Sequence, residues 1–254
     1  MTVIPALRRR RRDTVPPEQA ALPKREESAS NTVAHRLNWL RAGVLGANDG
    51  IVSTAGIVVG VSGAALTGSA LLASGLAGVI AGALSMAAGE YVSVSTQRDT
   101  ERSELAKERA ELAADPEAEL NELTLLIEEQ GVDEPLAREM AAQLTQRDAL
   151  AAHARFELGI DPNSLTNPWQ AAGASMFSFI LGALIPFVAI IAAPATIAVP
   201  VTVSAVTIAL AITGSVSAHL GGAPKRPAVL RNICGGLLAM GVTYSIGALV
   251  AACF

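Results

Sequence analysis

The apolar residues of this chain fall into two long blocks that are separated by a charged stretch. The first block runs from Leu40 to Val92 and the second occupies the C-terminal part of the chain, and both consist mainly of Ala, Val, Leu, Ile and Gly. A helix needs about 20 apolar residues to cross the hydrocarbon core of a bilayer, so the first block predicts two spans with a turn at residues 65–69. Pro194 and the segment 221–227 divide the second block into three further spans, near 169–192, 198–219 and 229–252.

The charged stretch between the blocks also predicts helices. Residues 93–114 are strong helix formers without a break, so the second span is expected to continue beyond the membrane until Pro116 ends it. Gly131 ends a second helix, at 117–130, and a third is expected at 134–158. The predicted fold class is therefore all-α, an integral membrane protein with five transmembrane helices per subunit and a three-helix acidic domain inserted between spans 2 and 3.

Charge is distributed unevenly along the chain. Of its 23 acidic residues, 17 lie between Ser93 and Asn167, where there are only seven basic residues. The N-terminal segment has arginine at every position from 8 to 12 and lacks the apolar surface that a folded segment requires. We expect four parts: a disordered basic tail at 1–33, transmembrane helices 1 and 2 at 34–92, the acidic helical domain at 93–167, and transmembrane helices 3 to 5 at 168–254.

Basic residues near the ends of the spans predict the orientation, because short cytosolic loops carry an excess of Lys and Arg. Such residues precede the first span, at Arg36 and Arg41, recur in the acidic domain and flank the last loop, whereas the intervening turns have none. The N-terminus and residues 93–167 are therefore expected in the cytosol, and Phe254 on the opposite side. A chain of this composition without an organelle signal suits a bacterial plasma membrane.

Two carboxylates, Asp49 and Glu90, lie within the predicted spans. A charged group at membrane depth costs about 2.5 to 3.5 kcal/mol on insertion scales, so such residues usually face a polar path and serve transport. Two other interpretations stay open. Glu90 is close enough to the cytosolic end of its span to reach interfacial water, and Asp49 could form an N-cap or a buried structural hydrogen bond.

Small residues favour close helix packing in the first two spans. Gly56 with Gly60, and Gly78 with Gly82, have the spacing of four that promotes helix association in lipid. Because five helices alone make a poor closed pore, we expect a homodimer with spans 1 and 2 near the shared axis. The alternative is that these glycines pack within one subunit.

Carboxylates recur at helical spacing in the acidic domain. Those on its first helix are three or four residues apart and share one face, where like charges repel one another unless a cation lies between them. Carboxylate oxygens bind Mg²⁺, Ca²⁺, Mn²⁺ and Fe²⁺ without choosing among them. The alternative is a solvated face that neighbouring Lys and Arg residues partly neutralise. The candidate metal ligands are Glu101, Glu104, Glu108 and Glu111 on the first helix, Glu119 and Glu122 on the second, and His153 and Glu157 on the third.

Two motifs in the spans resemble those of the vacuolar iron transporter family. They are Ala47-Asn48-Asp49-Gly50-Ile51-Val52-Ser53 in span 1 and Ser85-Met86-Ala87-Ala88-Gly89-Glu90-Tyr91-Val92-Ser93 in span 2, followed by Gln97-Arg98-Asp99. The resemblance extends from about His35 to Phe254 and includes the place where that family inserts a cytosolic metal-binding domain. It implies a homodimer of five-span subunits that exchanges cytosolic Fe²⁺, and often also Mn²⁺, for protons without using ATP.

The resemblance also implies roles for individual residues. In that family an aspartate of span 1 and a methionine of span 2 line the ion path at the dimer interface, and they match Asp49 and Met86. A thioether beside a carboxylate favours a borderline transition metal over Ca²⁺ or Mg²⁺. Where family members can have adjacent methionines, this chain has His153 and Ala154, which alters the preference of the site. The glutamates that match the family's metal-binding domain are Glu108, Glu111, Glu119, Glu122 and Glu157, with Glu101 and Glu104 assisting.

We therefore expect a transporter, not an enzyme, that exports cytosolic Fe²⁺, and Mn²⁺ or another divalent transition metal, in exchange for protons. Its path would include Asp49, Met86 and Glu90. The expected partners are a second copy of the chain, metal ions, protons and membrane lipid, with no nucleic acid and no cofactor.

Two alternative functions stay open. A membrane-bound ferroxidase would hold iron between helical carboxylates, although such sites usually need a Glu-x-x-His pairing, which the acidic domain lacks. A non-transporting membrane scaffold would bind basic partners through the acidic domain. That role leaves Asp49 unexplained.

Overall fold

The computed structural model describes the backbone of residues 24–163 and 165–253, and the side chains of these ranges from Ala42 onward. These residues form seven helices and no strand, so the expected all-α class is confirmed. The helices are α1 (Lys24–Gly63), α2 (Ser69–Ala114), α3 (Pro116–Glu128), α4 (Glu134–Phe156), α5 (Pro168–Ala192), α6 (Ala198–Leu220) and α7 (Lys225–Cys253).

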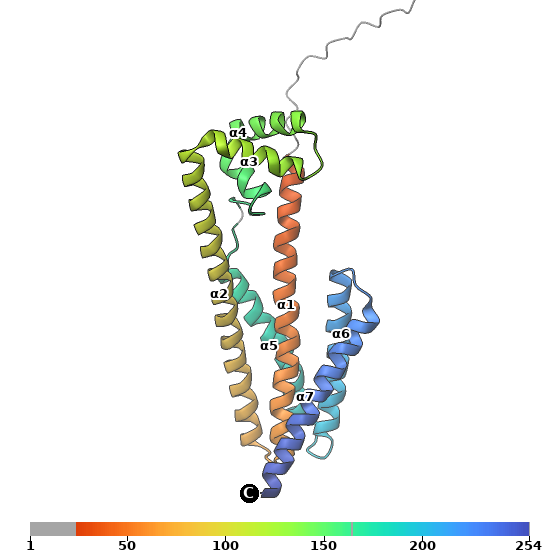
Figure 1. Cartoon of the computed structure of the whole chain (residues 1–254). Helices are drawn as coiled ribbons and strands as arrows, with labels where there is room; N and C mark the ends of the chain where they lie inside the picture. The colour runs from red at the N-terminus through yellow and green to blue at the C-terminus, as the bar shows by residue number, and fades with distance from the viewer. Residues whose placement is uncertain (1–23, 164, 254) are drawn as a thin grey trace, which may run out of the picture.

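The long helices α1 and α2 form an antiparallel hairpin, and the remaining helices group around its two ends (Figure 1). Helices α3 and α4 lie at the C-terminal end of α2. Helices α5, α6 and α7 pack beside the half of the hairpin that contains the turn between α1 and α2 (Figure 1). Helix α1 already begins at Lys24, so residues 24–33, which the sequence analysis assigned to the tail, are helical. The rest of that predicted tail, 1–23, lies outside the described residues.

Within the described ranges five helices are long and apolar enough to cross a membrane, as the sequence predicted. They are α2, α5, α6, α7 and the part of α1 from Ala42 to Gly63. Ala65 and Gly68, both with positive φ, form the turn between α1 and α2, within the segment expected for it. The last span differs from its prediction in one respect, because its helix already starts at Lys225.

The helices between spans 2 and 3 form a small unit with its own core. Helix α2 ends at Ala114, where Asp115 starts α3 by accepting a hydrogen bond at Oδ1 from the N–H of Ala118, at 3.1 Å. Proline at the first position of α3 fits this start, because its missing N–H has no partner to lose there. The core of the unit consists of Leu123 and Ile127 from α3 with Ala137, Ala141 and Ala152 from α4.

The glycines of α1 face other helices of the same chain. A Cβ on Gly56 would lie 3.5 Å from Cγ2 of Thr243, and one on Gly60 would lie 3.2 Å from the carbonyl oxygen of Thr243, so this part of α1 packs directly on α7. Gly50 touches a different helix. A Cβ at that position would overlap the carbonyl oxygen of Phe179 in α5, so α1 and α5 pack backbone to backbone there.

The glycines of α2 make room for large side chains of the same chain. A Cβ on Gly78 would lie 2.5 Å from Cδ1 of Ile57 in α1, and one on Gly82 would overlap the ring of Phe179 in α5. Both glycine pairs are therefore used for packing within one subunit, which is the alternative that the sequence left open. They do not by themselves argue for the homodimer.

Candidate metal centre

Three helices bring potential metal ligands to one point in the unit between spans 2 and 3. Glu108 comes from α2, Glu119 from α3 and His153 from α4, and their ligand atoms all lie within 4.8 Å of one another. Among residues 42–163 and 165–253, whose side chains the structure describes, no other group of three or more His, Cys, Asp or Glu residues is close enough to hold an ion. The sequence predicted all three as ligands, but not that they would be the ones to meet.

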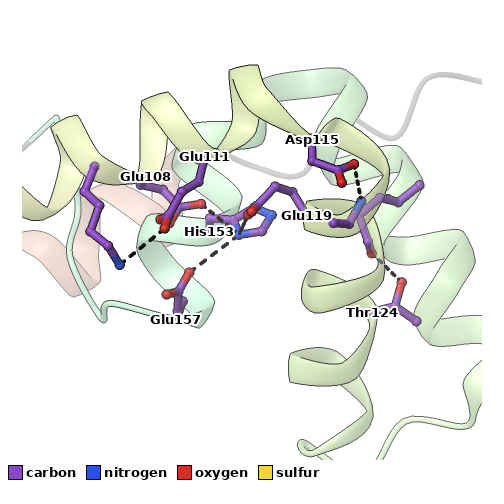
Figure 2. Close-up of polar contacts among 10 residues, drawn as sticks. Glu108, Glu111, Asp115, Glu119, Thr124, His153 and Glu157 are labelled. Atoms are coloured by element: carbon purple, nitrogen blue, oxygen red, sulfur yellow. Dashed lines mark hydrogen bonds and ion pairs between the residues drawn. The ribbon is translucent and has the colours of Figure 1, made fainter.

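The His153 ring is the centre of this group. Its Nδ1 lies 3.0 Å from Oε1 of Glu108, 3.6 Å from Oε2 of Glu119 and 3.6 Å from Oε2 of Glu157. Figure 2 shows these three carboxylates reaching the ring from different directions. Glu157 directly follows α4, and its N–H donates to the carbonyl oxygen of His153 at 2.8 Å, so the helix end orients the two residues together.

The group is buried, and three of its polar atoms have no hydrogen-bond partner. The side chain of His153 is 0% exposed and that of Glu108 is 3% exposed. Neither ring nitrogen of His153, nor Oε1 of Glu108, has a partner with hydrogen-bond geometry. A buried polar group without a partner costs about 1–3 kcal/mol, so a cation bound between these atoms would remove this cost.

The electrostatics of the centre also favour a cation. Burial raises the pKa of Glu108 to about 7, helped by the negative charge of Glu157, by a hydrogen bond with Glu157, and by the charges of Glu119 and Glu111. Burial is also the main cause that raises the pKa of Glu119, to which Glu122 adds, while His153 opposes the rise. Carboxyl groups that repel one another's charge in a desolvated place become ligands once a divalent ion neutralises them.

The other predicted ligands of this domain lie around the centre or outside it. Glu111 is engaged by Lys107, whose Nζ lies 3.5 Å from its Oε1. Glu122 is exposed on α3. Glu101 accepts a hydrogen bond from Nε2 of Gln97 at 2.8 Å. Like Glu104, it lies one to two turns before Glu108 on α2. The metal group therefore does not contain Glu101, Glu104, Glu111 or Glu122.

The three residues predicted for the path in the spans, Asp49, Met86 and Glu90, are each half-buried. The carbonyl oxygen of Asp49 accepts a hydrogen bond from Oγ of Ser53, one turn further along α1. Met86 packs against the hydrophobic cluster that contains Phe179 of α5. Glu90 follows Met86 by one turn on α2.

One residue of the site was not singled out from the sequence. Asp148 has extended backbone angles, φ −167° and ψ 95°, in the interior of α4, and its Oδ1 accepts a hydrogen bond from the N–H of Ala151 at 2.9 Å. It interrupts the helix five residues before His153. An aspartate is a common helix start, but in a stretch of helix formers such as this one nothing distinguishes it from a surface residue.

Comparison with known proteins agrees with the resemblance noted in the sequence. Residues 40–248 match the model of the VIT family. The chain is 46% identical to "Vacuolar iron transporter" of Acanthamoeba castellanii over 210 residues, which cover 82% of this chain and 77% of that protein. It is 34% identical to "VIT-like transporter 1b" of Glycine max over 236 residues, 92% of this chain and 86% of that protein.

A third relative extends the same result. "Vacuolar iron transporter homolog 2" of Arabidopsis thaliana is 33% identical over 226 residues, 89% of this chain and 91% of that protein. All three relatives carry the name of a transporter, which agrees with the expectation that the chain is a transporter and not an enzyme. With the family model covering most of its length, the chain belongs to the VIT family.

Proposed function

We propose that this protein moves Fe²⁺, and also Mn²⁺, out of the cytosol in exchange for protons. The observation that carries the proposal is the buried centre of Glu108, Glu119 and His153, which α2 connects to the apolar helices in a member of the VIT family. A desolvated centre for a divalent cation collects the ion, and the spans provide a route for it. Relatives that are named iron transporters support iron as the main cargo.

The proposed orientation places the metal centre in the cytosol. Lys225, Arg226 and Arg231 flank the loop between α6 and α7, and basic residues are retained on the cytosolic side of membranes. The rings of Tyr91 of α2 and Trp169 of α5 are in contact, with centroids 4.6 Å apart and planes tilted by 51°. Tyr and Trp prefer the membrane–water interface, so this pair would mark the cytosolic boundary, and residues 93–167 would project beyond it. By the same argument, the C-terminus would lie on the far side, across the plasma membrane that the sequence analysis favours.

Helix α2 connects the metal centre to the spans without a break. At 100° per residue, Met86, Glu90, Glu101, Glu104 and Glu108 fall on one face of this helix. The distance along the axis from Glu108 to Glu90 is about 27 Å at 1.5 Å per residue. The carboxylates on this face provide successive binding positions for an ion that moves from the buried centre to the membrane.

Asp49 is the proposed point of exchange inside the membrane. A carboxylate at that depth holds either a cation or a proton, because carrying its charge alone is costly in a medium of low dielectric constant. If the ion leaves toward the far side and a proton from that side takes its place, the two movements are coupled. Met86 offers a thioether to the same ion, which suits Fe²⁺ better than Mg²⁺.

We also propose that the protein is a homodimer. The part of α1 that carries Leu45 is open, since this side chain is 57% exposed, and α2 presents Leu76, Ile80 and Leu84 outward. These faces are free for lipid or for a second copy. Crosslinking between single cysteines at position 45 in membranes would detect a dimer through this face.

Iron flux into liposomes tests the transport proposal. Purified protein is reconstituted with an iron-quenched fluorophore inside the vesicles and an imposed pH gradient, acidic on the inside. We expect Fe²⁺ entry that competes with Mn²⁺, that collapses with the pH gradient, and that Asp49→Asn abolishes. Asp133→Asn, at an exposed position whose side chain makes no capping hydrogen bond, is the matched control.

The same measurement separates the alternatives. Flux that persists at the wild-type rate in Asp49→Asn would remove this residue from the path, and flux that ignores the pH gradient would remove the proton exchange. Oxidation of Fe²⁺ outside the vesicles without any entry would instead indicate an oxidase.

A further inference from the structure

The helix that carries His153 has a break five residues before the histidine. At Asp148 the backbone of α4 is extended, and the side chain of Asp148 accepts a hydrogen bond from the N–H of Ala151, so a second helical segment starts there. The two segments of α4 therefore meet at a kink at Asp148. Aspartate is among the best helix N-caps, and replacing such a cap by alanine typically costs about 1 kcal/mol.

The segment after the break is held firmly in place by its own packing. Ala152 belongs to the core with Leu123 and Ile127 of α3, and Ala154 is fully buried on the other side of His153. Small side chains on both sides of the histidine let this segment sit close to α2 and α3. The ring of His153 is therefore fully enclosed and pointed into the carboxylates.

The distances around the ring suit a metal site in which Nδ1 of His153 is one of the ligands. A carboxylate oxygen and an imidazole nitrogen both offer lone pairs, and the 3.0 Å contact between Nδ1 of His153 and Oε1 of Glu108 lacks hydrogen-bond geometry. Ligands bound at about 2.1 Å lie about 3.0 Å apart in an octahedral site and about 3.4 Å apart in a tetrahedral one. The separations of 3.0 and 3.6 Å from Nδ1 to the three carboxylates are close to those values.

We propose that His153, presented by the helix break at Asp148, is the residue that makes this centre prefer transition-metal divalent cations to Mg²⁺ and Ca²⁺. Imidazole is a good ligand for Fe²⁺, Co²⁺, Ni²⁺ and Zn²⁺, whereas Mg²⁺ and Ca²⁺ require oxygen ligands. Glutamates alone would admit all of these ions. The abundant cytosolic ions are thus rejected at the point of capture, before the membrane path. This inference rests on the proposed function, in that it assumes a divalent ion binds to the centre.

Metal titration of the full-length protein in detergent tests the role of His153. Co²⁺ is the probe, because its visible absorption reports nitrogen ligation, and Mg²⁺ and Ca²⁺ are the competitors. In the wild type we expect Co²⁺ to bind at least about a hundredfold more tightly than either competitor. His153→Gln should weaken Co²⁺ binding by at least about tenfold and alter its spectrum, while Ca²⁺ binding changes by less than about threefold. His219→Gln, at an exposed position at the end of α6, is the matched control.

Variants of the cap test the role of Asp148 as a positioning residue. Asp148→Ala should weaken Co²⁺ binding and broaden its spectrum, and Asp148→Asn, which also caps helices, should restore both. Asp133→Ala is the control, because Asp133 precedes the same helix without making a capping hydrogen bond. His153→Met serves as a second variant of the ligand itself if His153→Gln does not fold.

The results separate this inference from the proposed function. If His153→Gln binds Co²⁺ with wild-type preference and spectrum, or loses all ions equally, the role of His153 is overturned while the centre stands. If Asp148→Ala matches the wild type, the helix break does not position the ligand. If the wild type binds no divalent ion here while Fe²⁺ flux persists, the metal centre is overturned and the transport path is not.

Discussion

The charge of Glu108 is expected to destabilise the metal-free domain at neutral and alkaline pH. Burial and the neighbouring carboxylates raise the pKa of Glu108 from 4.5 to about 7 in the folded protein. A carboxyl group whose pKa is higher when folded stabilises the fold fully below pH 4.5, and that contribution is lost as the pH rises through about 7. The difference between the two pKa values corresponds to about 3 kcal/mol. Glu108→Gln, which keeps the shape and removes the charge, should restore most of this stability at pH 8.

Hydrogen exchange of the backbone amides in α3 and α4 measures this effect locally. The wild type and Glu108→Gln are compared at the same pH in the presence of a chelator, so that intrinsic exchange rates cancel. At pH 5 the two proteins should exchange at similar rates. At pH 8 the variant should exchange up to about a hundredfold more slowly, which is the rate ratio that about 3 kcal/mol represents.

Adding a divalent metal at pH 8 should make the wild type exchange more slowly than Glu108→Gln, the reverse of the metal-free result. An ion neutralises Glu108 in the wild type and slows its exchange, whereas the variant lacks a charged ligand and gains less. Glu117→Gln, an exposed glutamate in the first turn of α3, should behave as the wild type throughout. Equal protection of the wild type and Glu108→Gln at every pH between 5 and 8 would refute the reasoning, because it would mean that the charge of Glu108 does not destabilise the folded domain.

Two further predictions concern packing. Gly182→Ala should lower the unfolding temperature of the detergent-solubilised protein by an amount equivalent to about 1–3 kcal/mol, because the added Cβ would overlap the carbonyl oxygen of Ala47 and separate α5 from α1. Gly173→Ala, with no atom within 4 Å of the added group, should be harmless, and equal melting of the two variants would contradict this packing. Leu123→Ala should cost about 2–5 kcal/mol because Leu123 is fully buried in the core of the domain. Leu125→Ala, at a side chain that is 60% exposed, should cost far less. Hydrogen exchange of the amides of α4 measures both costs, and equal exchange rates in the two variants would contradict the prediction.

The elements of this protein could be read from its sequence because each depends on local chemistry. Span lengths follow from runs of apolar residues, and the end of α2 follows from Pro116, whose ring cannot continue a helix. The break at Gly131 and the division around Pro194 also lie where the structure has them. These signals act over a few residues, so tertiary contacts did not have to be known.

The site was only partly predictable, because spacing along one helix does not say which faces of different helices will meet. Eight ligands were predicted in the acidic domain, and three of them form the close group, with Glu157 beside it. Glu101 and Glu104 share their face of α2 with Glu108 but lie too far along the helix. The glycines of the first two spans likewise showed where backbones approach closely, but not that the partners would be α5 and α7 of the same chain.

The sequence by itself determined that the described part of the chain is helical with five helices apolar enough to cross a membrane, and its motifs pointed to the family, since hydropathy and short motifs are properties of contiguous residues. Only the tertiary structure decided that His153 is fully buried with Glu108, Glu119 and Glu157 around its Nδ1. The physical reason is that the enclosure depends on the packing of α2, α3 and α4 and on the helix break at Asp148, which combine residues far apart in the chain.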